Sequence, residues 1–221
     1  IVASVNTNGS DLLLRPNIEY NGPKSLEGLS IATFPPGSIQ DIVLRKWLGD
    51  NGVDISKIKI HGMGPGEAVT AIEASKVDGV FLPHPSPSKI ELDKKGIVVV
   101  PSGEMWADHA CCSLLVSGRL MREQPDLVDQ IIKTHIKATD YVNANPEEAT
   151  EIYAKRTKQD LTMIKRSVEN WDGEWVSDPK IQIPSTVEYA RVDKQLGYIN
   201  KSLSEDDLFD SSFYAHVIDS A

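Results

Sequence analysis

The sequence is poor in cysteine, in positive charge and in long hydrophobic runs. Its 221 residues include only two cysteines, too few for a fold built on several disulfides. The 23 Lys and Arg residues are outnumbered by 32 Asp and Glu residues, so the formal net charge is −9. This balance offers no basic surface for phosphate backbones or anionic lipid, which argues against nucleic-acid binding. No apolar run approaches the roughly 20 residues that a transmembrane helix requires.

Familiar catalytic and metal-binding motifs are also missing from the sequence. The five histidines are dispersed, and there is no H-E-x-x-H, Cys-x-x-Cys or Gly-x-Ser-x-Gly motif. The glycine-rich loop at 62–66 fails the dinucleotide fingerprint, because Glu67 stands where the last glycine is required. His135 falls on the apolar face of a predicted helix, which favours a buried structural histidine over a ligand. The sequence therefore predicts no cofactor, no metal site and no catalytic residue.

The two cysteines are adjacent, at Cys111 and Cys112. Consecutive Cα atoms lie about 3.8 Å apart, below the usual separation across a disulfide, so we expect two unbridged thiols. Residues 110–116 read as a strand, and neighbouring side chains in a strand point to opposite faces of the sheet. The simplest interpretation is a pair of small strand residues, one on each face.

The first half of the chain alternates strand and helix signals. Strands are predicted at residues 30–34, 58–60, 79–82 and 97–101, with helices between them. Short connections between alternating elements predict a mainly parallel sheet covered by helices, a three-layer lobe. Beyond residue 116 the pattern is helical throughout, with proline and acidic residues at several predicted helix starts.

Some loops after these strands carry candidate ligand-binding residues, because open α/β sheets bind ligands beyond the carboxyl ends of their strands. Gly37, Ser38 and Gln40 lie where a helix N-terminus presents backbone N–H groups and a positive dipole end. Ser38 followed by Asp41 is also a helix-capping pattern, so a purely structural role for Ser38 stays open. His84 and His109 each follow a predicted strand, and each is either a ligand contact or a surface histidine.

Three strings of residues go beyond generic α/β patterning. They are Ala-Thr-Phe-Pro-Pro-Gly-Ser at 32–38, Lys-Val-Asp-Gly-Val-Phe-Leu-Pro-His-Pro at 76–85 and Ser-Gly-Glu-Met-Trp-Ala-Asp-His at 102–109. Together they resemble the substrate-binding proteins of the nitrate/sulfonate/taurine class of ABC importers, and the resemblance extends to about residue 158. It implies a type II periplasmic-binding-protein fold: two three-layer α/β lobes, a hinge that the chain crosses twice, and a solute held between the lobes.

The resemblance also implies a division of the chain and a ligand site. Residues 1–20 and 107–221 would form the first lobe, and residues 21–106 the second. The first lobe is expected to be incomplete. An apolar side would then be exposed, or covered by a second molecule or by rearranged helices, at Val5, Leu12, Leu14, Leu114 and Val116, and such apolar patches favour self-association. The expected ligand contacts are Gly37, Ser38, Gln40, Pro83, His84, Trp106 and His109, with Asn8 and Gly9 at the hinge.

The function implied by the resemblance is solute binding for an ABC importer. The solute would be small and polar or anionic, of the nitrate, sulfonate, taurine or thiamine-precursor class, and the partner a membrane permease. The location would be periplasmic or otherwise extracytoplasmic, with a lipid anchor as an option for the full-length protein. The alternative is an enzyme on the same scaffold, such as a thiamine-pyrimidine synthase or a desulfinase-like protein, with Cys111 and Cys112 resembling the iron-binding cysteine cluster of the former. A departure from the family pattern is Leu82, which stands where an acidic residue usually precedes proline.

Overall fold

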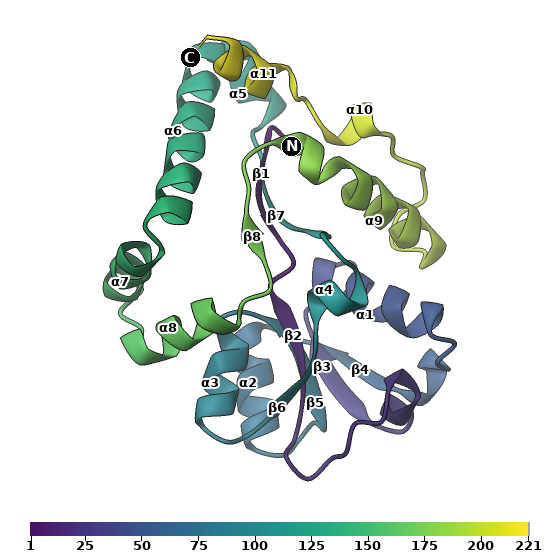
Figure 1. Ribbon diagram of the computed structural model, residues 1–221. Helices are drawn as coiled ribbons and strands as arrows, with labels where there is room; N and C mark the ends of the chain where they lie inside the picture. The colour runs from purple at the N-terminus through teal and green to yellow at the C-terminus, as the bar shows by residue number, and fades with distance from the viewer. Residues whose placement is uncertain (221) are drawn as a thin grey trace. The chain divides into compact units, whose positions relative to one another are not determined.

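The computed structural model describes residues 1–220, and the chain divides into two compact units (Figure 1). Unit 1 contains residues 1–8, 108–152 and those from 173 onward, and unit 2 contains residues 9–107 and 153–172. The chain thus passes between the units after Asn8, Ala107, Ile152 and Asp172, whereas two crossings were expected. The predicted boundary at residue 20 is also corrected to residue 8, because the strand that begins at Ser10 belongs to the sheet of unit 2.

Unit 2 is built on a five-stranded sheet with the order β4-β3-β5-β2-β6. The strands are β2 (Ser10–Leu14), β3 (Ser30–Thr33), β4 (Lys59–Gly62), β5 (Gly79–Pro83) and β6 (Ile97–Pro101). β3 runs parallel to β4 and β5, and the four predicted strands are present and run in one direction, as expected. β2 enters between β5 and β6 and is antiparallel to both.

The position of β2 follows from its run of three leucines. A strand that is flanked by two others and covered on both faces needs apolar side chains at consecutive positions. Leu12, Leu13 and Leu14 meet that requirement and are at most 1% exposed. The expected exposure of Leu12 and Leu14 on an incomplete first lobe is therefore wrong, since both are core residues of unit 2.

Helices cover both faces of this sheet, which gives unit 2 three layers (Figure 1). α2 and α3 pack on one face, α1 and α4 pack on the other, and α8 packs against α3. The bounds are α1 (Ile39–Asp50), α2 (Pro65–Glu73), α3 (Ser86–Leu92), α4 (Ser102–Met105) and α8 (Leu161–Asn170). The core under α2 and α3 includes Leu13, Ile72, Leu82 and Ile90, each worth about 1.5–3 kcal/mol of burial.

Unit 1 has a smaller, antiparallel sheet with β1 in its centre. β1 (Ala3–Thr7) lies between β7 (Ala110–Leu114) and the short β8 (Glu174–Trp175). The helices are α5 (Gly118–Glu123), α6 (Pro125–Ala144), α7 (Pro146–Thr157, which continues into unit 2), α9 (Ile183–Gln195), α10 (Glu205–Leu208) and α11 (Ser212–Asp219). His135 on α6 lies 2.6 Å from the Ser4 carbonyl oxygen, as the structural interpretation of this histidine predicts.

The pairing of β1 with β7 contains two register shifts that the sequence pattern does not reveal. Ser4 lies opposite Ser113, Asn6 opposite Cys112 and Thr7 opposite Ala110, so the register skips Val5 and then Cys111. A skipped residue disturbs the strict alternation of side chains, as in a β-bulge. Regular alternation therefore does not decide the faces of the two thiols here, but their settings differ: Cys111 is buried and Cys112 is exposed. The two thiols are not joined by a disulfide, as expected.

Candidate functional site

Polar residues from several strands lie at the carboxyl edge of the unit 2 sheet, the edge at which β3, β5 and β6 end. Because β2 is antiparallel, it starts at the edge where β5 and β6 end: Ser10 lies opposite Pro83 and Asp11 opposite Pro101. The loops that follow β3, β5 and β6 reach the same edge, the usual ligand position in open α/β sheets. Ser10 and Asp11 are consecutive strand residues, so their side chains point to opposite faces.

On one face, Ser10 connects β2 to α1 and α4. The Gln40 side-chain amide donates to Ser10 Oγ at 3.3 Å, and the Ser10 N–H donates to Ser102 Oγ at 3.1 Å. All three residues are buried. Since buried polar groups are costly unless they are hydrogen-bonded, these bonds fix the first turns of both helices against the strand.

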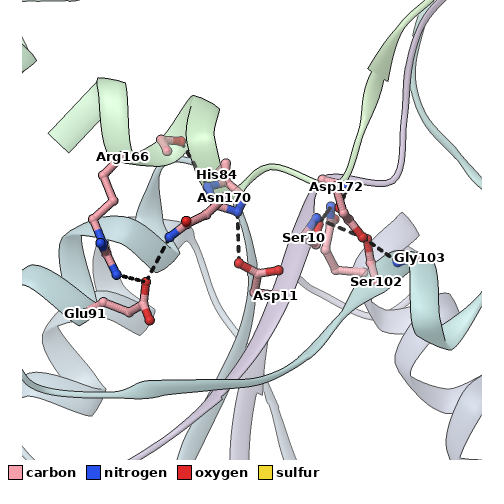
Figure 2. Close-up of polar contacts among 12 residues, drawn as sticks. Ser10, Asp11, His84, Glu91, Ser102, Gly103, Arg166, Asn170 and Asp172 are labelled. Atoms are coloured by element: carbon pink, nitrogen blue, oxygen red, sulfur yellow. Dashed lines mark hydrogen bonds and ion pairs between the residues drawn. The ribbon is translucent and has the colours of Figure 1, made fainter. Parts of the chain in front are cut away.

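On the other face, Asp11, His84 and Ser167 form a buried array. Figure 2 shows Asp11 and His84 facing each other. His84 Nε2 lies 2.9 Å from Asp11 Oδ2, and His84 Nδ1 lies 2.9 Å from Ser167 Oγ. A carboxylate only accepts hydrogen bonds, so Nε2 carries the proton that faces Asp11. When His84 is neutral, Nδ1 accepts from the Ser167 hydroxyl, and the array holds α8 to β2 and β5.

These three residue types also form catalytic triads, but this array lacks what a triad needs. Ser167 lies inside α8, where the nearby backbone N–H groups bond within the helix, and so they cannot form an oxyanion hole. Ser167 is also 6% exposed, which leaves little room for a substrate carbonyl. The geometry is that of a structural clamp.

Asp172, at the end of the segment that carries α8, binds two backbone N–H groups at this edge. The Gly9 N–H donates to Oδ1 at 2.8 Å. The Gly103 N–H donates to Oδ2 at 2.7 Å (Figure 2). Hydrogen bonds to an ionised acceptor are stronger than neutral ones. The carboxylate therefore joins the first residue of unit 2, the short helix α4 and the α8 segment at one point.

A second contact ties α8 to α3 further from the edge. Glu91 Oε2 accepts from Arg166 at 3.5 Å and from the Asn170 amide at 3.4 Å (Figure 2). Arg166 is 43% exposed, so this ion pair contributes little to stability compared with the buried array.

At the start of α1 the predicted cap is confirmed. Ser38 Oγ accepts from the Asp41 N–H at 3.3 Å, and the Gly37 N–H, at φ +83°, donates to Asp41 Oδ2 at 3.2 Å. The Arg45 Nε lies 2.7 Å from the other carboxylate oxygen of Asp41. Both Gly37 and Ser38 are thus engaged within their own helix turn.

The remaining predicted site residues lie in different settings. Trp106 is half-buried at the end of α4, with Lys46 Nζ 5.3 Å from its ring centroid, a cation–π contact. Asn8 and His109 belong to unit 1, where the Asn8 N–H donates to the His109 carbonyl at 3.0 Å. His109 is 1% exposed, and its Nδ1 lies 2.8 Å from the Tyr189 hydroxyl.

The structure therefore brings Gly9, Gln40, Pro83 and His84 to one edge of unit 2 and adds residues that the sequence analysis missed. Those residues are Ser10, Asp11, Ser102, Ser167 and Asp172. Asp11 had a sequence signal, since it is a lone charge at the head of a leucine run. Ser167 and Asp172 had none, because nothing in the pattern shows that residues 153–172 return to unit 2.

Two solved structures share the fold of this chain. The periplasmic nitrate-binding protein NrtA of Synechocystis gives a TM-score of 0.87 at 17% identity, over 100% of this chain and 67% of that protein. The alkanesulfonate-binding protein SsuA of Xanthomonas axonopodis gives 0.81 at 17% identity, over 95% and 72%. The chain therefore has the fold of the periplasmic binding proteins.

The family is shown by the sequence comparison. The model of the NMT1-like family matches residues 1–156, so the chain belongs to the NMT1-like family. A protein of Brucella abortus that is named as a binding protein is 25% identical over 153 residues, which is 68% of this chain and 48% of that protein. The chain spans about half the length of the curated relatives it matches. Among the described residues, no helix has the length and hydropathy of a membrane span.

Proposed function

We propose that this chain forms much of the solute-binding component of an ABC importer and captures a small polar or anionic solute. The proposal rests on one observation above all: the NMT1-like family match is combined with a fold shared along almost the whole chain with proteins named for nitrate and alkanesulfonate binding. An enzyme on this scaffold would need an activated nucleophile or a metal centre. In the Asp11–His84–Ser167 array the hydroxyl that could serve as nucleophile is buried inside α8, away from any substrate.

The proposed solute contacts in unit 2 lie at the carboxyl edge of its sheet. Gln40 and His84 reach that edge from α1 and from the loop after β5. Gly37 and Ser38 lie at the N-terminus of α1, Pro83 and Trp106 add apolar surface, and Gly9 completes the proposed set in unit 2. Asn8 and His109 remain proposed contacts on the unit 1 side of the chain. The donors are mostly neutral, which favours a small solute recognised by hydrogen bonds over one that needs several cations.

Isothermal titration calorimetry with nitrate, an alkanesulfonate and taurine tests this proposal. Binding of at least one probe is expected, and Gln40→Ala should weaken it by about 1–3 kcal/mol, because it removes a buried polar partner. Gln195→Ala is a matched control on an exposed position of α9 and should leave affinity unchanged. Equal affinity in Gln40→Ala and the parent chain would remove this edge as the site.

His84→Ala should weaken binding and also lower stability. It would leave the Asp11 carboxylate, 2% exposed, without its bond from His84. The stability loss is expected to be about 1–3 kcal/mol, measured by urea unfolding. Formation of a new product from any probe, followed by mass spectrometry, would instead support the enzyme alternative.

The proposal carries further consequences for the whole protein. Its partner would be a membrane permease and its location extracytoplasmic, with a lipid anchor as an option for the full-length protein. Self-association through unit 1 is also proposed, on the grounds that β7 is a strand at the edge of its sheet within the described residues.

A further inference from the structure

The adjacent cysteines of β7 differ sharply in their surroundings. Cys111 is 8% exposed and lies near Tyr189, whereas Cys112 is exposed to solvent. Tyr189 is itself buried against His109 and the Ala110 carbonyl, and burial, together with the nearby Cys111, raises the pKa of the Tyr189 hydroxyl. Tyr189 therefore stays protonated at neutral pH and adds no charge beside the thiols.

The register of β7 lets these two thiols act together. Because the pairing with β1 skips Cys111, the regular alternation of side chains breaks at this residue, and the Cys111 thiol acts as a hydrogen-bond donor to the adjacent Cys112 sulfur. This bond lowers the pKa of Cys112 to about 7, although burial of part of the side chain acts in the opposite direction. A thiolate is the nucleophilic form of cysteine, so an exposed and hydrogen-bonded one is reactive.

We propose that Cys112 is a thiol-modification site that forms a stable mixed disulfide with low-molecular-weight disulfides, with Cys111 as its positioning residue. The Cys112 thiolate attacks one sulfur of the reagent. A sulfur–sulfur bond forms to Cys112, the sulfur–sulfur bond of the reagent breaks, and the second half leaves as a thiolate. The disulfide reagent is the only oxidant, and one equivalent of thiol is released for each chain modified.

The mixed disulfide should persist because closure onto Cys111 is unfavourable. The Cα atoms of ordinary disulfides are about 4.4 Å or more apart, whereas consecutive Cα atoms are about 3.8 Å apart. A bond between the two sulfurs would therefore be strained. Burial also keeps Cys111 from reaching the reagent. Cys111 therefore does not resolve the adduct, and its contribution is the hydrogen bond to the Cys112 thiolate.

Reaction of the full chain with dithiobis(nitrobenzoate) tests the assignment. The native protein should release one equivalent of coloured thiolate, retain one adduct by mass spectrometry, and release a second equivalent only after denaturation. The rate should rise with pH through a midpoint near 7. Cys112→Ser should abolish the fast phase and, since the position is exposed, should leave the circular dichroism spectrum unchanged.

The role of Cys111 is tested by a pair of variants. Cys111→Ala removes the hydrogen-bond donor and should move the midpoint of the pH profile upward, slowing the reaction about fivefold at pH 6. Cys111→Ser keeps a donor and should retain most of the parent rate. Two equivalents released without an adduct, or no reaction of the native chain, would overturn the proposal. An unshifted midpoint in a folded Cys111→Ala protein would overturn the role of Cys111.

Discussion

Gly9 is constrained in two ways at the start of unit 2. Its φ of +90° lies where side chains are rarely tolerated, and an added Cβ would stand 2.0 Å from Nε1 of Trp171. We expect Gly9→Ala to lower the free energy of unfolding by about 3 kcal/mol or more, from backbone strain plus the displaced ring. Urea unfolding followed by tryptophan fluorescence measures the loss.

Gly28 offers a matched control for this prediction. Its φ is +91°, almost the same, but nothing lies within 4 Å of a Cβ built there. Gly28→Ala should therefore show only the backbone strain, about 1–2 kcal/mol. Equal losses in the two variants would mean that Trp171 does not pack on Gly9 as described.

Single residues also show what the sequence could and could not predict about the site. The cap at Ser38 and the positions of Gln40 and His84 followed from local rules, because helix starts and strand ends are set by nearby residues. The partners of His84 did not follow, since Ser167 is 83 positions away in the chain. Periodicity does not encode such distant pairings.

At the scale of elements, α8 is held to unit 2 by Asp172 beyond its C-terminus, by the contacts of its last turns with Glu91, and by His84. Asp172→Asn should loosen this segment. It replaces one carboxylate oxygen by an NH₂ group, which cannot accept the hydrogen bond from the Gly9 or the Gly103 N–H. We expect a loss of about 1–3 kcal/mol and faster hydrogen exchange at the amides of α8 than in α1. Hydrogen-exchange mass spectrometry resolves the two helices.

The N-cap of the same helix supplies the control. Asp160 accepts from the Met163 N–H, and asparagine caps helices as well as aspartate does. Asp160→Asn should therefore leave the exchange rates of α8 nearly unchanged. If both variants loosen α8 equally, its first turn rather than the Asp172 bridge controls the helix.

At the opposite end of the strands from the candidate site, Asp78 connects the end of β2 with the starts of β3 and β5. It accepts from Arg15 Nη2 at 2.6 Å and from the Ser30 N–H and hydroxyl at 2.9 and 2.8 Å. Burial raises the pKa of Asp78, but the Ser30 and Arg15 hydrogen bonds outweigh it and hold the pKa below the usual value of an aspartate. Because the folded pKa is lower than the unfolded one, the stabilisation is complete above the unfolded pKa and is lost as pH falls through the folded value.

Asp78→Asn should therefore destabilise the chain by about 1–2 kcal/mol at pH 7 and much less at the lowest pH at which it stays folded. Chemical unfolding at a series of pH values measures both curves. A difference that stays constant down to pH 2–3, or that grows there, would contradict the sign of the pKa shift.

Individual strands were easier to predict than the unit to which each strand belongs. All four strands expected between residues 30 and 101 are present, because each is a short apolar run bounded by turn residues. β2 was assigned to the wrong unit, although its three leucines indicated a strand covered on both faces. The bulge at Cys111 was missed, since a register shift depends on the partner strand and not on the local pattern.

For the molecule as a whole, the domain organisation was the least predictable feature. Residues 153–172 belong to unit 2 through contacts with α3, α4, Gly9 and His84, and then the chain returns to unit 1. The sequence predicts the helices of this segment but not the unit on which they pack, because an amphipathic helix fits many apolar faces. The family resemblance ends near residue 158, so it does not show to which unit these helices belong either.

The net charge of −9 produces electrostatic repulsion between two copies of the chain. β7 is at the edge of the unit 1 sheet within the described residues and carries no charged residue to deter pairing, and Leu115 beyond it is 73% exposed. Mutual repulsion between acidic molecules opposes contact at this edge at low salt. Salt shortens the range of that repulsion to about 10 Å at 0.1 M, while the apolar contribution remains.

We therefore expect self-association that increases with NaCl concentration, measured by sedimentation velocity under reducing conditions so that Cys112 forms no disulfides. Leu115→Lys should suppress it, because the substitution removes the exposed apolar side chain and places a charge beside the edge strand. Leu92→Lys, on α3 of unit 2 at a 44% exposed position, adds the same charge away from β7 and should leave the association largely intact. A chain that stays monomeric at all salt concentrations, or equal suppression by both variants, would show that β7 does not mediate contact between copies.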